Sequence, residues 1–367
     1  MDAVLAVFRD IRDPRDSNAR HPLPAMLFIA LAATLCGAKS ICAIADFAAA
    51  REALFAQIVD LPHGVPSHDC FSRVFRVLDP LEMEDAFARF VKALRLGLGL
   101  GPPSGVVDTD GKRMRGGYER GRAFMPPLMV GVFDAETRLS LAACHAPGGD
   151  EVAATLRILQ TVVLKGCTVT ADALHCHPRM AQTVLDQGAD YALKLKGNNG
   201  PLHRLAKATF AEADARGDLA DFAQRDAGHD RVEIRRASVV VPPPGASAFP
   251  GLAAFGRIES TRQTTGGKLE ARVHYVVLSQ KLSPRRMLEV TRSHWSIENH
   301  LHWQLDVVFH EDAARTRKDH APENLSMLRR IALDILRSSP DKKSIARKMN
   351  CAAWSDTFFF SLFTQMQ

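Results

Sequence analysis

Residues 167–197 read CTVTADALHCHPRMAQTVLDQGADYALKLKG, in which two short apolar runs flank an amphipathic segment. The runs CTVTA and YALKL have the length and composition of buried strands. Between them, Pro178 opens and Gly188 closes a segment with helical spacing. Two strands joined through a helix are a building unit of α/β domains, so this stretch predicts an α/β fold.

The residues before this stretch extend the same unit. VVDT (106–109), PPLMVGVFD (126–134) and RLSLAACH (138–145) are apolar runs separated by turn residues, which is typical of antiparallel strands. EVAATLRILQTVVLK (151–165) has helical spacing and stops before a glycine. The expected order is β-β-β-α-β-α-β, which predicts a mixed sheet with helices on its faces.

Residues 1–96 carry helical patterns only, and they predict an N-terminal helical domain. Proline or serine marks helix starts at Pro22, Ser40, Ser67 and Pro80. The segment 43–78 fits either a helix-turn-helix DNA reader or a plain helical bundle. The glycine-rich run GLGLGPPSG (97–105) separates this domain from the core.

The core is expected in two pieces, residues 105–197 and 283–337. Between them, residues 198–282 hold a charged helix and strand-like runs, which predict a β-rich insertion. A helix that begins at Ser283 returns the chain to the core. The last stretch, 338–367, is expected to be a basic C-terminal tail.

The composition narrows the class of protein. The 367 residues carry 47 Lys and Arg against 41 Asp and Glu, and this net charge of +6 suits a polyanionic partner as well as an ordinary soluble protein. The longest apolar run, residues 26–38, is too short to span a bilayer, and no signal-peptide pattern is expected. Seven cysteines without paired spacing fit a reducing cytoplasm. The cluster His175-Cys176-His177, with Cys167 upstream, would aim adjacent ligands to different sides, so zinc is not expected there.

Asp110 is the first candidate functional residue, because it ends a predicted strand and precedes Gly111, whose missing side chain lets a ligand approach. Asp108 lies on the same face by strand alternation and is a substitute for it. A cationic cluster follows, made of Lys112, Arg113, Arg115, Arg120 and Arg122. An acid beside such a cluster suits a metal ion held against a phosphate backbone, and a solvated turn has the same pattern.

Asp172 is the second candidate. It ends the strand predicted over 167–171, at the edge where open α/β sheets place their sites. His175 follows three positions later, within reach of a phosphate or a metal-bound water. A helix N-cap is the competing interpretation of an aspartate at this position.

Glu298 is the third candidate, inside the helix expected after Ser283, with His294 and His302 one turn before and after it. A His-Glu-His stripe suggests a transition-metal site, but its outer members would lie about 12 Å apart, too far for one ion bonded at about 2 Å. We therefore interpret Glu298 as a carboxylate of a divalent-metal site. Other acids that fit this position are Asp306, Glu311 and Asp312.

Three acids from distant parts of a chain are what a site needs to hold two hard divalent cations, and such ions leave positions free for phosphate oxygens. The residues alone thus suggest a metal-dependent enzyme that acts on DNA. Neither a P-loop nor a Gly-x-Ser-x-Gly motif occurs in the sequence, which disfavours ATP use and serine-hydrolase chemistry.

These motifs resemble those of the ISAs-one family of DDE transposases, which includes the H-repeat-associated proteins. The longest match is HWSIENHLHWQLDVVFHED (294–312). The others are DTDGKRMRG (108–116), VTADALHCH (169–177), ALKLKGNN (192–199), GHDRVE (228–233) and residues 13–40, which carry the DPR and RHPL of the family's N-terminal associated domain. The chain departs from related transposases at Thr291 and His294, where they carry Tyr and Arg, and at Asp230, where the family has glycine.

The resemblance implies an RNase H-like core in which Asp110, Asp172 and Glu298 bind Mg²⁺, with Mn²⁺ as a substitute. It also implies DNA cleavage at element ends and strand transfer into target DNA, by in-line displacement at phosphorus. Supporting roles at the site would fall to His175, Asn299 and His294. Phosphate contacts would come from Lys112, Arg113, Arg115, Lys194 and Lys196.

The expected partner is DNA, bound by a homodimer in the bacterial cytoplasm and associated with the nucleoid, and no membrane partner is expected. Two other functions are compatible with the sequence. A mobile-element protein that has lost its activity would keep the fold and bind DNA without cutting it. A zinc hydrolase that uses the histidine-rich stripe is the third hypothesis.

Overall fold

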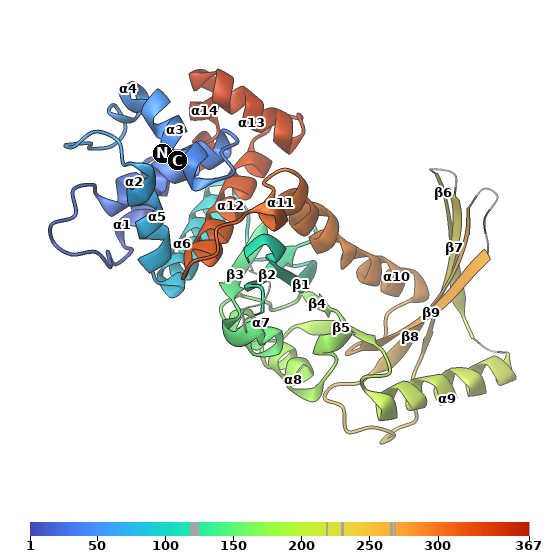
Figure 1. Cartoon of the computed structure of the whole chain (residues 1–367). Helices are drawn as coiled ribbons and strands as arrows, with labels where there is room; N and C mark the ends of the chain where they lie inside the picture. The colour runs from blue at the N-terminus through green and yellow to red at the C-terminus, as the bar shows by residue number, and fades with distance from the viewer. Residues whose placement is uncertain (118–124, 218, 229–230, 265–266, 268, 367) are drawn as a thin grey trace.

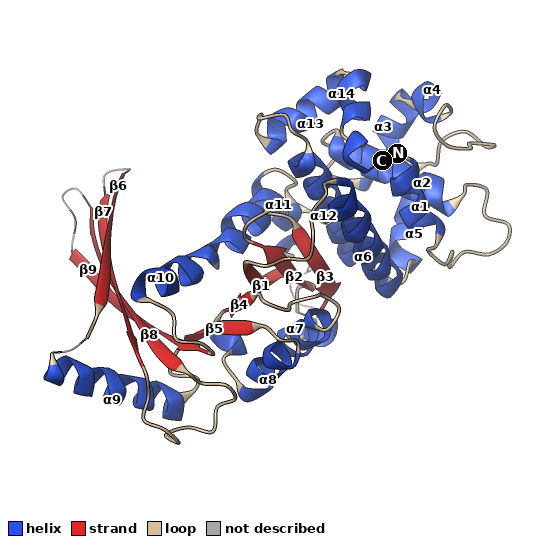
Figure 2. Ribbon diagram, turned by 180° about the vertical axis from the view of Figure 1, so that it is seen from behind, coloured by secondary structure: helices blue, strands red, loops and turns tan. Residues whose placement is uncertain are grey.

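The computed structural model describes residues 1–117, 125–217, 219–228, 231–264, 267 and 269–366 (Figure 1). A helical lobe lies beside a mixed α/β core, and long strands project from the other side of that core (Figures 1 and 2). The N- and C-termini lie next to each other in the helical lobe. Within the described chain, no helix has the length and apolar character needed to cross a membrane.

The helices of the lobe are α1 (Asp2–Arg9), α2 (Leu23–Leu35), α3 (Ile41–Ala50), α4 (Glu52–Phe55), α5 (His68–Val77), α6 (Pro80–Gly97), α12 (Ala321–Ser338), α13 (Ile345–Trp354) and α14 (Asp356–Ser361). Those beside the sheet are α7 (Glu151–Leu159), α8 (Pro178–Asp186), α9 (Gly200–Arg216), α10 (Pro284–Ser293) and α11 (Trp303–Val307).

The core strands are β1 (Val106–Arg113), β2 (Leu128–Asp134), β3 (Ser140–His145), β4 (Thr168–Ala171) and β5 (Asp190–Leu195). β2 pairs antiparallel with β1 and β3, whereas β4 pairs parallel with β1 and β5. The predicted antiparallel unit, the mixed sheet and the order β-β-β-α-β-α-β are therefore confirmed. This architecture is consistent with an RNase H-like fold.

The two faces of the core sheet are covered by different helices. Val130 of β2 packs with α7, α8 and α9 on one face, whereas Phe133 packs with α12 and the helical lobe on the other. Val106 of β1 packs with α10. Because side chains alternate along a strand, Asp108 and Asp110 lie on the same face of β1 as Val106, toward α10.

The helical lobe follows the predicted helix starts. The Ser40 hydroxyl accepts a hydrogen bond from the Ala43 amide at the start of α3, and Ser67 caps α5 in the same way. Proline occupies the first turn of α2 and of α6. Residues 338–367, expected as a basic tail, contain α13 and α14, and α13 packs against α12 and α2.

Residues 198–282 continue the core sheet rather than standing apart from it. They form α9 and the strands β6 (Asp221–Gly228), β7 (Arg231–Val240), β8 (Ala254–Thr264) and β9 (Leu269–Leu278). β9 pairs antiparallel with β5, so the whole sheet runs β3-β2-β1-β4-β5-β9-β8-β7-β6. The sequence predicts three of these strands and misses β6, because DFAQRDAG has almost no apolar residues to show an alternation.

Candidate active site

Asp110 and Asp172 lie side by side on neighbouring parallel strands, but Asp110 lies inside β1 and not at its end as predicted, whereas Asp172 directly follows β4. Thr109 of β1 is the partner of Ala171 of β4, so the next residues along the two strands are Asp110 and Asp172. One pair earlier, the Thr170 hydroxyl donates a 2.6 Å hydrogen bond to Oδ1 of Asp108 across the strands. Strand alternation thus places the side chains of Asp108, Asp110, Thr170 and Asp172 on the α10 face, and the predicted shared face of Asp108 and Asp110 is confirmed.

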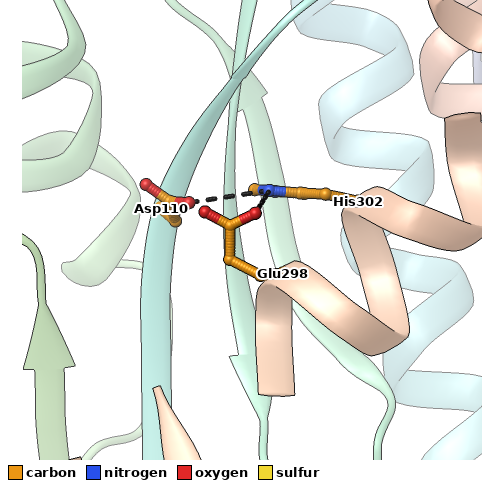
Figure 3. A group of neighbouring side chains, drawn as sticks. All are labelled: Asp110, Glu298 and His302. Carbon is orange, nitrogen blue, oxygen red and sulfur yellow. Dashed lines mark ion pairs between the residues drawn. The ribbon is translucent and has the colours of Figure 1, made fainter. Parts of the chain in front are cut away.

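Glu298 reaches Asp110 from the helices that cover this face. One ligand atom each from Asp110, Glu298 and His302 lies within 4.8 Å of the other two (Figure 3). Nδ1 of His302 lies 3.5 Å from Oδ2 of Asp110 and 3.9 Å from Oε2 of Glu298. In the part of the chain that the structure describes, no other such group of metal-ligating side chains occurs.

The helix that carries Glu298 differs from the predicted one. Instead of a continuous α-helix after Ser283, α10 ends at Ser293, a π-helical segment spans Ile297–His302, and α11 follows. The predicted stripe of His294, Glu298 and His302 does not share one group, because Nδ1 of His294 lies 3.1 Å from the Thr170 hydroxyl. Glu298 and His302 lie within the π-helical segment and remain close to each other, whereas His294 precedes that segment and contacts β4 instead.

Several acidic side chains lie close together in this site, and they shift one another's pKa values. Burial, the neighbouring carboxylate of Glu298, and the acids Glu151 and Asp172 raise the pKa of Asp110 to about 8. Partial burial acts to raise the pKa of Asp172, but Lys194, whose Nζ lies 3.2 Å from Oδ1 of Asp172, outweighs it and the pKa is lowered. The neighbouring His302 ring is the main reason that the pKa of Glu298 is lowered.

The donor set fits a divalent cation. Carboxylate oxygens are the ligands that Mg²⁺ and Mn²⁺ prefer, and Mn²⁺ also accepts an imidazole nitrogen. Burial lowers the pKa of His302, so its ring is neutral and keeps a lone pair for a metal. A cation between Asp110 and Glu298 would also remove the mutual repulsion that raises the pKa of Asp110.

Glu151 is an acid of this site that the sequence analysis misses. A Cβ on Gly111 would lie 2.5 Å from the carboxyl carbon of Glu151, so this acid occupies the space that the glycine leaves beside β1. Oε1 of Glu151 is 3.2 Å from Nε2 of the fully buried His175. The proposed supporting residue His175 therefore contacts Glu151 directly.

His294 and Asn299, for which the resemblance implies supporting roles, lie before and beside Glu298 in sequence. Burial lowers the pKa of His294 to about 4, so this ring is neutral. Asn299 is exposed and lines a pocket of about 500 Å³ between α10 and the strands β7–β9, together with Lys194 and Trp295. This pocket is adjacent to the acidic cluster, because His294 and Thr170 line it as well.

The cations predicted to contact phosphates lie in different environments. Lys112 is buried and its ammonium is paired with Asp306 at 2.6 Å and Asp312 at 3.1 Å, so it cannot reach a phosphate in this conformation. Arg115 and Lys196 are exposed. Arg113 is partly buried and Lys194 is paired with Asp172. Arg120 and Arg122 lie outside the described residues, as does Asp230.

The remaining candidate ligands are used elsewhere. Asp306, Glu311 and Asp312 all lie within 4.0 Å of the Lys112 ammonium, which explains why acids follow the Glu298 motif without joining its cluster. Cys167 donates to the Pro103 carbonyl, and Nδ1 of His177 accepts the Met180 amide at the start of α8. These bonds engage atoms that a zinc ion at this cluster would need.

Comparison with known proteins agrees with the fold. Residues 101–335 match the family described as Transposase DDE domain, and residues 5–91 match the family described as DDE_Tnp_1-associated. The chain is 29% identical to the "Putative transposase YncI" of Escherichia coli O157:H7, over 94% of this chain and 89% of that protein. It is 27% identical to the "H repeat-associated putative transposase YhhI" of Escherichia coli K12, over 94% of this chain and 93% of that protein.

A third relative, from Xanthobacter autotrophicus, carries the name "Uncharacterized protein in dhlA 3'region" and is 34% identical over 71% of this chain and 88% of its own length. The family match over residues 101–335 spans Asp110, Asp172 and Glu298. The chain therefore belongs to the DDE transposases, and within them to the H-repeat-associated type.

Proposed function

We propose that this protein is an active insertion-sequence transposase, which cuts DNA at the ends of its element and joins the freed ends to target DNA. Asp110, Asp172 and Glu298 are its proposed catalytic acids. The observation that carries this proposal is the clustering of Asp110 with Glu298 and His302 within 4.8 Å, beside the strand end that presents Asp172. A protein that only bound DNA would gain nothing from acids placed against a polyanion.

The chain's own residues would hold and position the reacting groups. Asp110, Asp172 and Glu298 would hold Mg²⁺, or Mn²⁺ in its place, which when bound stabilises charge on phosphate oxygens and lowers the pKa of a bound water. The Lys194 ammonium pairs with the carboxylate of Asp172, and in the complex it would contact a phosphate oxygen of the DNA. The hydrogen bond between His294 and Thr170 ties the helix of Glu298 to β4.

The exposed cations Arg115 and Lys196 are the proposed phosphate contacts nearest the acids, since both follow strands that carry or adjoin the catalytic residues. We also propose that two copies of the chain act together, because two DNA ends have to be processed in concert. Sedimentation of the protein with and without end DNA tests this stoichiometry. Association with the nucleoid follows if the affinity for DNA is as expected.

The test uses purified protein and duplex DNA that carries the inverted repeats flanking the coding region. Cleavage should require Mg²⁺ or Mn²⁺ and should stop in EDTA. Glu298→Gln should reduce cleavage to the EDTA level. Glu289→Gln, which changes an exposed acid of α10 in the same way, is the matched control and should cleave normally. Equal cleavage by wild-type protein in EDTA would refute the proposed chemistry.

The same assay separates an enzyme from an inactive DNA-binding relative. Asp172→Asn should abolish cleavage and keep DNA binding, because the acid contributes to holding the metal and not to contacts with phosphates. A wild-type protein that binds end DNA tightly but never cuts it, with either metal, would favour the binding-only function. Tightly bound zinc in elemental analysis would instead favour a hydrolase.

A further inference from the structure

A second polar groove lies away from the acidic cluster, between the helical lobe and the segment that follows α11. Its volume is about 760 Å³. One wall comes from residues 39–42 at the start of α3 and from His68, Ser72 and Arg76, which share one face of α5. The other wall is His310 and residues 313–318. We call it the α3–α5 groove.

The lining of the α3–α5 groove is strongly biased toward positive charge. It contains Lys39, Arg76, Arg315, Arg317 and Lys318, together with two histidines, and no Asp or Glu is among the described residues that line it. The whole chain has 47 basic against 41 acidic residues, so an even distribution would place almost as many acids as cations in this lining. A concave surface with one sign of charge concentrates a polyanion.

Three of these cations are available to a ligand. Lys39, Arg315 and Lys318 are exposed, and within the described residues their side chains have no recorded ion pair or hydrogen bond. The other two hold the walls in place. Arg76 pairs with Asp319 at 2.7 Å, and Nε of Arg317 donates to the Gly116 carbonyl at 2.9 Å.

The outer wall is fastened to the strand of Asp110. A Cβ on Gly116 would lie 2.4 Å from the Ala314 carbonyl oxygen, so the backbone after β1 packs directly on the groove segment. The buried Lys112 of β1 also pairs with Asp312, just before that segment. A ligand held in the α3–α5 groove is therefore held in a defined position relative to the catalytic strand.

We propose that the α3–α5 groove binds the phosphodiester backbone of the duplex at the element end, so that this duplex is positioned for cutting at Asp110. The inference rests on the proposed function. Unpaired cations and the hydroxyls of Ser72 and Thr316 suit phosphate oxygens. The described residues of the lining include no Phe, Tyr or Trp on which unpaired bases could stack, and this favours duplex over single-stranded DNA.

The test measures DNA affinity as a function of salt, in EDTA so that no cleavage occurs. The groove variant is the full chain with Lys39→Gln, Arg315→Gln and Lys318→Gln. The logarithm of the DNA association constant falls linearly with the logarithm of the salt concentration, and each lost phosphate contact should make this slope less steep by about 0.9. Three lost contacts should therefore reduce its magnitude by about 2.7. Relative to 1 M salt, that difference weakens binding about 100-fold at 0.15 M.

The matched control removes the same charge from exposed positions on other helices and loops, with Lys165→Gln, Arg179→Gln and Lys207→Gln. Its slope should stay close to that of the wild type. Arg315→Lys in an otherwise wild-type chain should keep the slope, because the charge remains. Thermal unfolding of every variant should match the wild type, since all the changed side chains are exposed.

Several results would overturn the inference. The first is a salt dependence of DNA affinity that is unchanged in the groove variant, and the second is an equal loss of affinity in the control variant. The third is that the groove variant loses as much affinity for single-stranded DNA, or for RNA of the same length, as for duplex DNA. The fourth is a change in subunit association while DNA affinity stays intact. The proposed function fails in a different way, if wild-type protein does not cut end DNA with Mg²⁺.

Discussion

Replacing Asp110 with asparagine should stabilise the metal-free protein while removing its activity. The carboxyl group is 16% exposed and lies beside the acids Glu298, Glu151 and Asp172, and burial and these acids raise its pKa from 3.8 to about 8. The folded state without metal therefore has to keep this group protonated or tolerate its repulsion. An asparagine side chain at this position would have the same size and no charge.

The size of the effect follows from the two pKa values of Asp110. Between pH 3.8 and about 8, the unfolded chain has lost the proton that the folded chain retains, so stability falls as the pH rises. Each pH unit in that window costs about 1.4 kcal/mol, which gives about 4 kcal/mol at pH 7. Asp110→Asn should recover up to that amount in EDTA, and little of it near pH 4.

The assay is urea unfolding in EDTA at pH 4, 5.5 and 7, repeated with Mg²⁺. Wild-type protein should gain stability from Mg²⁺ and release about one proton at pH 7, whereas Asp110→Asn should do neither. Asp172→Asn is the control, because the expected change in stability has the opposite sign. The pKa of Asp172 is lowered in the folded protein, so its ionised carboxylate stabilises the fold above the pKa of the unfolded chain. The Asp172→Asn protein should be no more stable than wild type. The reasoning is refuted if Asp110→Asn destabilises the protein in EDTA at pH 7, or if Mg²⁺ stabilises both proteins equally.

Three further substitutions test the surroundings of the site. Gly111→Ala should displace Glu151 from beside β1 and cost about 1–3 kcal/mol of unfolding free energy, with a parallel fall in cleavage; unchanged stability would contradict the close contact. Thr170→Val leaves the buried Asp108 without its hydrogen-bond donor and should cost about 1–3 kcal/mol in the same assay. Lys112→Met leaves the partly buried Asp306 and Asp312 without the Lys112 ammonium and should cost about 1–3 kcal/mol. A Lys112→Met protein of normal stability that loses DNA affinity would restore this lysine to the DNA contacts.

The core of the fold could be predicted because its elements are marked locally. Strands β1 to β5 are apolar runs bounded by turn residues, and Ser40, Ser67 and Ser283 are visible as helix caps. The place of Asp172 directly after a buried strand was predictable for the same reason, whereas Asp110 lies inside β1, which continues past the predicted end to Arg113. The sequence pattern of a single strand or helix was sufficient for a prediction where that strand or helix alone fixes the direction of the side chain.

Elements that depend on their neighbours were not predictable. β6 is a strand because it pairs with β7 along its length, and its own residues show no apolar alternation. Lys112 has the same sequence context as a lysine that binds phosphate. Only the fold brings Asp306 and Asp312 to it, from about 200 positions away, and turns it into a buried ion pair.

The π-helix that presents Glu298 packs on the sheet at a position where β2 has no side chain. Gly131 of β2 is the direct partner of Asp110 on β1, and a Cβ there would lie 3.3 Å from Cδ2 of Leu301 and 3.9 Å from Cδ1 of Ile297. The missing side chain lets these two buried residues of the π-helix settle onto the sheet next to Asp110. The helix thereby approaches closely enough for Glu298, which lies between them in sequence, to meet the strand acid. The contact between the helix and the sheet thus depends both on the glycine in β2 and on the π-helical residues that pack against it. Neither segment has a sequence pattern from which this contact could be predicted.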